Sequence, residues 1–155
     1  MEIFKKYWFV LVVVVVIIAL YVAVKKGVMD MFLGKSDEQK LAEEELGKLE
    51  YNSNNLTITT SDAILIAQQL LSAMDQYGTD EKTIVALLDG LNRDDLLFVI
   101  KIFGIKKYNG VGEAVGLDRF IYAQNLNLAG WLKSELSGKD LDKVAAMFAN
   151  FKIPF

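Results

Sequence analysis

The sequence predicts an all-α protein, with a transmembrane helix near the N-terminus and a small domain of five helices behind it. Two observations support this prediction. Residues 7–24 form one uncharged and strongly apolar run, and from residue 61 onward apolar residues recur at helical spacing between short polar breaks. A chain of 155 residues leaves room for one core of ordinary size behind such an anchor.

The predicted membrane segment follows a six-residue flank, residues 1–6, and extends from Tyr7 to Val24. Lys5 precedes it and Lys25 follows it. A helix of this length covers about 27 Å, close to the roughly 30 Å of a bilayer's hydrocarbon core. A cleavable signal peptide is the alternative, but its apolar region usually has only about 7 to 15 residues. We therefore expect an uncleaved single-pass anchor in the lipid bilayer.

The orientation of the anchor is weakly encoded. Two lysines precede the apolar run and two follow it, so the positive-inside rule barely distinguishes the two orientations. Of the two, we favour a C-terminal domain on the non-cytoplasmic side of the membrane.

Residues 25–60 are expected to form a juxtamembrane spacer. Ser36 and Gln39 have the spacing of a capping box and open a charged helical pattern. Residues 51–55 are rich in asparagine and read as a linker, and residues 56–60 are expected to be extended. This spacer would lead into the folded domain, residues 61–155.

The first two helices of the domain are predicted from periodicity and punctuation. Ser61 and Asp62 would begin the first helix, whose apolar stripe is formed by Ile66, Leu70, Ala73 and Tyr77. Gly78 would end this helix. Thr79 would cap the second helix, where Ile84, Leu87 and Leu88 form the apolar side.

Three further helices follow. Asn92 would cap the third, which carries Leu96, Val99, Ile100 and Phe103 and stops at Gly104. Residues 106–126 show no sustained period and are predicted to be a long inserted loop. The fourth helix is expected over residues 127–136, with Leu128, Trp131, Leu132 and Leu136 buried. The fifth is expected from about Asp140, with Leu141, Val144, Ala145, Phe148 and Phe151 on its apolar side.

Composition excludes several classes of function. The net charge is −3 and the basic residues are scattered, so the electrostatic footprint of a nucleic-acid-binding protein is missing. The chain has no cysteine and no histidine, which excludes thiolate and imidazole metal sites and every triad that needs these residues. The acidic residues form no recognisable catalytic pair. We therefore predict a protein that is not an enzyme, with a tethered cell-wall hydrolase as a remote alternative.

Two stretches resemble one annexin repeat. They are AMDQYGTDEKTIVALL at residues 73–88 and WLKSELSGKDLDKVAAMF at residues 131–148, and the motifs GTDE and SELSG follow each other in the family's order. The resemblance covers residues 62–151 once, whereas annexins carry four repeats. It implies a five-helix unit, and residues 106–126 would be an insertion into it.

The resemblance also implies a calcium site. The family pattern places backbone carbonyls of Met74, Gln76 and Gly78 around the ion, closed by the carboxylate of Glu135. This donor set suits Ca²⁺, which takes six to eight hard oxygens. Gln76 stands where the family has a glycine. The alternative is that Gly78 only ends a helix and Glu135 is a solvated residue at a helix end.

The inserted loop supplies the best candidates for a contact surface, Phe120 and Tyr122, because long loops in compact domains usually bind something or are disordered. Together these features predict a membrane-anchored, non-catalytic module that docks a protein partner or a membrane surface. The alternative is self-assembly, as a structural protein present in many copies in an assembly such as the membrane of a lipid-containing virion.

Overall fold

The computed structural model describes residues 17–18, 20–21, 37–75, 78–114 and 123–155. The chain divides into two compact units, Met1–Ser36 and Asp37–Phe155. Most of the predicted membrane segment lies outside the described residues, and its four described residues are helical and exposed. Within the described part of the chain, no helix is long and apolar enough to cross a bilayer.

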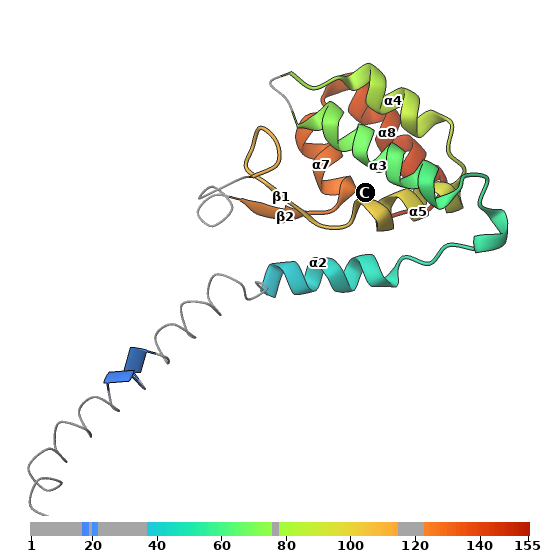
Figure 1. The fold of residues 1–155 in the computed structure, drawn as a ribbon. Helices are drawn as coiled ribbons and strands as arrows, with labels where there is room; N and C mark the ends of the chain where they lie inside the picture. Colours follow the sequence, from blue (N-terminus) through green and yellow to red (C-terminus); the bar gives the residue numbers. More distant parts are fainter. Residues whose placement is uncertain (1–16, 19, 22–36, 76–77, 115–122) are drawn as a thin grey trace, which may run out of the picture. The chain divides into compact units, whose positions relative to one another are not determined.

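The second unit is mostly helical (Figure 1). Its elements in chain order are α2 (Asp37–Lys48), the 3-10 turn η1 (Ser53–Asn55), α3 (Thr60–Met74), α4 (Glu81–Asp89), α5 (Arg93–Phe103), β1 (Lys106–Tyr108), β2 (Gln124–Leu126), α7 (Leu128–Glu135) and α8 (Gly138–Asn150). The five helices predicted behind residue 60 are all present. The predicted all-α class is therefore confirmed in its coarse form, with one small β-hairpin added.

Helix starts differ from the prediction at two places. α3 begins at Thr60 because the Thr59 hydroxyl accepts from the Asp62 N–H and the Asp62 carboxylate accepts from the Thr59 N–H, which completes a capping box. α4 is capped by Asp80 rather than Thr79. The Thr79 hydroxyl donates to Glu135 instead. The Thr79 hydroxyl could either cap α4 or bond to Glu135. The local sequence does not show which of these two contacts forms.

The caps of α5 and α7 and the end of α5 agree with the prediction, whereas the start of α8 does not. Asn92 caps α5 through the Asp95 N–H, and Asn127 caps α7 through the Gly130 N–H. Gly104 ends α5 with φ +67, a backbone conformation that glycine adopts without strain. α8 begins at Gly138, two residues before the predicted start.

The predicted inserted loop, residues 106–126, is not structureless where it is described. β1 and β2 pair antiparallel, with Lys106 opposite Leu126 and Tyr108 opposite Gln124. Beyond β1 the chain folds back once more, because the Ala114 N–H donates to the Lys107 carbonyl. Strands of three residues are too short to show an alternating pattern of apolar and polar residues, so β1 and β2 could not be predicted.

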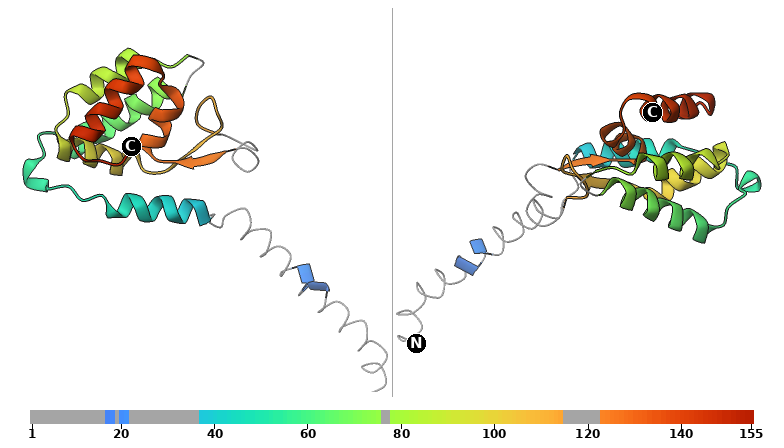
Figure 2. Two further views of the ribbon diagram at one scale, coloured as in Figure 1. Left: turned by 180° about the vertical axis from the view of Figure 1, so that it is seen from behind. Right: turned by 90° about the horizontal axis from the view of Figure 1, so that it is seen from above.

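The core lies between α3, α4, α5, α7 and α8. α3 contacts α4, α5 and α7, and α4 also contacts α8 (Figure 2). Trp131 is fully buried, and its ring lies 6.1 Å from that of Phe103 and 4.9 Å from that of Tyr108, measured between ring centroids. Trp131 therefore joins the hairpin to the helical core.

The predicted spacer does not behave as a free stalk over its described part. α2 contacts β2, and Leu46, Leu49 and Tyr51 are partly buried against the core. The Tyr51 ring lies 5.1 Å from that of Phe98. The compact unit begins at Asp37, in contrast to the predicted domain start at residue 61.

Two buried carboxylates at the start of α5, those of Asp94 and Asp95, hold the segment between α2 and α3. We call this pair the aspartate clamp. Asp94 accepts from the Asn52 N–H at 3.0 Å and from the Asn55 side-chain amide at 2.9 Å. Asp95, which is 0% exposed, accepts from the Thr57 N–H at 2.8 Å and the Thr57 hydroxyl at 2.6 Å. The predicted linker is thus a fixed part of the domain.

The Asp94 carboxylate makes its full contribution to the clamp only while it is ionised. The Asn52 N–H, followed by the Asn55 amide, lowers the pKa of Asp94 below its ordinary value. The folded state therefore holds this proton less tightly than the unfolded chain. The contribution of Asp94 to stability is complete above the ordinary aspartate pKa and is lost as the pH falls through the lowered one.

Candidate functional site

The candidate site lies at the carboxylate of Glu135, where three segments that are distant in the sequence come together. The Thr79 hydroxyl, from the connection between α3 and α4, donates to Oε2 of Glu135 at 2.5 Å. The Tyr108 hydroxyl, at the end of β1, donates to Oε1 at 2.7 Å. Glu135 itself is the last residue of α7. One carboxylate thus fixes two loops to the end of a helix.

Local structure places each of these three groups. Glu135 follows Trp131 by four residues, so both lie on the same side of α7, which faces the hairpin. Tyr108 packs its ring on Trp131 and extends its hydroxyl to the carboxylate. Gly78 has φ +98, which a residue with a side chain rarely adopts, and it delivers Thr79 to the same carboxylate.

A tight turn projects beside this carboxylate. The Asn109 N–H donates to the Gly112 carbonyl, and the Asn109 side-chain oxygen accepts from the Val111 N–H, as in an Asx turn. Val111 at the tip is 53% exposed. A Cβ on Gly112 would approach Oδ1 of Asp75 to 2.4 Å, so only glycine lets the turn lie this close to the end of α3.

The three segments enclose a small open hollow of about 180 Å³. Its lining combines Gly78 and Thr79, Tyr108, the turn at residues 110–111, and Ser134 and Glu135. Of the described residues that line it, Glu135 alone is charged. The hollow is therefore polar and carries a negative charge.

Burial of the Tyr108 phenol gives a testable pH dependence. Desolvation, followed by the hydrogen bond to Glu135 and the charge of that carboxylate, raises the pKa of Tyr108 to about 12. The unfolded chain loses this proton near pH 10, before the folded protein does. The stability that Tyr108 contributes is therefore complete below about pH 10 and is lost between about pH 10 and 12. Tyrosinate absorbance during an alkaline titration measures the raised pKa of Tyr108.

A Tyr108→Phe variant identifies the signal. We expect the variant to lack the titration step at about pH 12 that the unaltered protein shows. A loss of absorbance change near pH 10 instead, with no difference near pH 12, would show that the phenol is not buried against Glu135.

The structure brings together some of the predicted calcium residues. Gly78 and Glu135 line the same hollow. The Met74 side chain is buried in the core, and Gln76 lies outside the described residues. Both oxygens of Glu135 already accept hydroxyl protons, and no cluster of three acidic side chains occurs among the described residues. Bidentate binding of Ca²⁺ would require the Thr79 and Tyr108 hydroxyls to turn away, so calcium stays a prediction.

The sequence prediction missed the functional partners of Glu135. It assigned Thr79 to a helix cap and placed Tyr108 in the inserted loop, and no local pattern connects either residue with position 135. The predicted contact residues Phe120 and Tyr122 lie outside the described residues.

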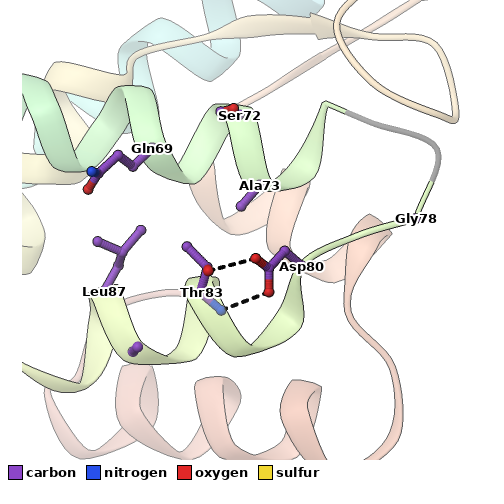
Figure 3. Close-up of a pocket in the computed structure, with 8 residues that line it drawn as sticks. Gln69, Ser72, Ala73, Gly78, Asp80, Thr83 and Leu87 are labelled. Atoms are coloured by element: carbon purple, nitrogen blue, oxygen red, sulfur yellow. Dashed lines mark hydrogen bonds between the residues drawn. The ribbon is translucent and has the colours of Figure 1, made fainter.

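A second hollow, of about 490 Å³, lies between α3 and α4 (Figure 3). Gln69 and Ser72 on α3 face Thr83 and Leu87 on α4. The one carboxylate in its lining, Asp80, accepts from both the N–H and the hydroxyl of Thr83. The same hydroxyl bond, followed by the N–H, lowers the pKa of Asp80. This carboxylate serves as a helix cap, which gives the hollow no evident acid or base.

We found no match between this chain and any family model, curated protein or solved structure. The function therefore has to be argued from the geometry of the molecule itself.

Proposed function

We propose that the protein is a membrane-anchored, non-catalytic docking module that holds a partner protein at one fixed surface. This docking surface consists of residues 78–79, the turn at residues 109–112, and residues 134–135. Residues 7–24 supply the anchor, because a long uncharged run between lysine pairs suits a bilayer-spanning helix. A rigid polar surface on a tethered domain suits recognition of another macromolecule.

The observation that carries this proposal is the double hydrogen bond to Glu135. It joins the connection between α3 and α4, the β1 end and the α7 end at 2.5 and 2.7 Å. Charge-assisted bonds of this kind are roughly twice as strong as neutral ones. Loops held in this way lose little conformational entropy when a partner binds, which favours affinity.

The use of the described carboxylates supports a role without catalysis. Asp62 and Asp80 cap helices, and Asp95 holds the segment between α2 and α3. Glu135 accepts from two hydroxyls. Catalytic acids and bases need a free face towards a substrate and a second polar group in reach. Asp62, Asp80 and Asp95 are instead committed to structure.

Site-specific photo-crosslinking in the native membrane tests the proposal. A photo-reactive amino acid at position 111 places the probe at the exposed tip of the docking surface. A probe at position 54 is the matched control, because Asn54 is also exposed and belongs to η1, at the opposite end of the unit from the hairpin (Figure 1). We expect one dominant adduct from position 111 and none of that mass from position 54.

The composition of the adduct separates the candidate functions. An adduct with a different protein supports docking of a partner. An adduct of two copies of this chain would favour the building block of a multi-copy assembly. Equal and diffuse labelling from both positions would show that residues 109–112 are not a docking surface.

A further inference from the structure

The hollow at Glu135 presents hydrogen-bond acceptors, and we propose that it binds a primary ammonium group, supplied by a lysine side chain of the partner protein. This inference rests on the proposed docking function and names the chemistry that the docking surface recognises. Three features support it: the directions in which the hydroxyl groups of the hollow donate, the charges around the hollow, and the size of the hollow.

The three hydroxyl groups among the described residues that line the hollow have each used their single proton. Thr79 and Tyr108 donate to the two oxygens of Glu135. Ser134 donates to the Gly130 carbonyl at 3.0 Å. A hydroxyl has one proton and two lone pairs. The three side-chain oxygens are therefore left with lone pairs only, and a ligand in contact with them has to be a donor.

The Glu135 carboxylate can likewise accept further hydrogen bonds. An ionised carboxylate has about four lone-pair positions, and the described hydroxyl bonds to Glu135 fill two of them. An ammonium group brings three donors and a compact positive charge, which suits acceptors arranged around a point. A guanidinium group prefers to approach both carboxylate oxygens in one plane. Here each oxygen is already approached by a hydroxyl, so the ammonium is the better match.

Neighbouring charges strengthen the preference for a cation. Asp75 and Glu113 stand at the rim of the turn, where the Glu113 N–H donates to Asp75. Two lysines that do not line the hollow lie over aromatic rings elsewhere: Lys106 is 5.4 Å from the Phe103 ring centroid and Lys133 is 5.0 Å from that of Phe155. Among the described residues that line the hollow there is no lysine or arginine. The local potential thus attracts a positive group from outside.

Size and surroundings favour a lysine side chain over an aminolipid headgroup. The hollow of about 180 Å³ has room for the end of a lysine side chain once a few waters, each about 30 Å³ in the liquid, have left. Loops that enter a lipid surface usually carry several large apolar side chains. Val111 is the one large apolar side chain exposed here within the described residues. A protein surface that delivers one lysine fits this arrangement better.

A titration of the full chain in phosphatidylcholine nanodiscs tests the ammonium site. The probe is n-butylammonium chloride, followed through the backbone amide shifts of Thr79, Gly110 and Ser134 by NMR. n-Butyltrimethylammonium chloride is the matched control, because it has the same chain and charge but no N–H donor. We expect n-butylammonium to bind about tenfold more tightly. Equal affinities, or no shift with either salt, would overturn the inference.

Two variants assign the binding to Glu135. Glu135→Gln removes the charge inside the hollow, and we expect it to weaken n-butylammonium binding about tenfold. Glu113→Gln removes a charge nearby without altering the lining, and it should leave binding within about twofold. Similar losses in both variants would show a diffuse effect of charge. If Glu135→Gln fails to fold, the comparison of the two salts on the unaltered chain still tests whether the hollow binds an ammonium group through its N–H donors.

The source of the ammonium is tested separately from the docking function. Excess n-butylammonium should suppress the adduct from position 111 in native membranes, and an unchanged yield would overturn the lysine assignment. The same shifts produced by phosphatidylethanolamine nanodiscs alone would overturn it in favour of a lipid amine. An adduct from position 111 together with no n-butylammonium binding would refute this inference and leave the docking module standing.

Discussion

Replacing Asp95 with alanine is expected to lower the free energy of unfolding by about 3 to 5 kcal/mol, one of the two largest losses that we predict for a single substitution. The Asp95 carboxylate is 0% exposed and accepts from the N–H and the hydroxyl of Thr57, and at 3.4 Å from the Ile58 N–H. Alanine leaves these donors without their acceptor and removes a carboxylate that the fold buries completely. Urea-induced unfolding of the full chain in detergent micelles, followed by circular dichroism, measures the change.

Asp142→Ala is the control for Asp95→Ala. Asp142 lies exposed on α8, so its loss should change stability by no more than about 0.5 kcal/mol. A thermal midpoint that drops by roughly 10 to 20 °C for Asp95→Ala alone would agree with the clamp. Equal stabilities of the two variants would show that the segment at residues 52–58 is held by apolar contacts and not by the carboxylates.

Replacing Trp131 with alanine is expected to cost about 3 to 5 kcal/mol as well, for a different reason. Trp131 is among the largest fully buried side chains and packs against Phe103 and Tyr108. Its removal opens a cavity between the hairpin and the core, and it also takes away the ring that positions Tyr108. We therefore expect the variant to lose both stability and the late alkaline titration step of Tyr108.

Trp131→Phe separates packing from hydrogen bonding. The indole nitrogen is buried and has no hydrogen-bond partner among the described residues. Phenylalanine therefore loses volume but no hydrogen bond, and the cost should be about 1 to 2 kcal/mol. The same unfolding measurement compares the two variants. A loss from Trp131→Phe as large as that from Trp131→Ala would reveal a partner for the indole nitrogen.

The apolar patterns of the shorter helices could be read from the sequence. The predicted stripes of α5 and α7, including Leu96, Phe103 and Trp131, are buried as expected. In α3 the predicted stripe was only partly right: Leu70 is buried, whereas Ala73 is partly buried and Tyr77 lies outside the described residues. Ala63 and Ala67 are buried, while Ile66 is only partly buried. Small residues let α3 approach α5 closely, and a pattern based on large apolar side chains does not detect such a face.

The polar contacts of the fold could not be read in the same way. Asp94 and Asp95 look like ordinary first-turn residues that complement a helix dipole. Apart from Arg93, which donates to Asp94, their partners lie 37 to 42 residues away and are backbone N–H groups or short polar side chains without a distinctive pattern. Glu135 is similar, with partners 27 and 56 residues away. Such contacts depend on tertiary packing, which brings the segments together first.

The position of the clamp has a mechanical consequence for a tethered domain. If the chain is anchored as we propose, tension from the bilayer reaches the domain through α2 and then through residues 52–58. The carboxylates of Asp94 and Asp95 hold that segment at the start of α5. Such a pull would act on the contact between α2 and β2 first and on these hydrogen bonds next. The carboxylates would thus keep residues 52–58 on α5 while the membrane around the anchor moves.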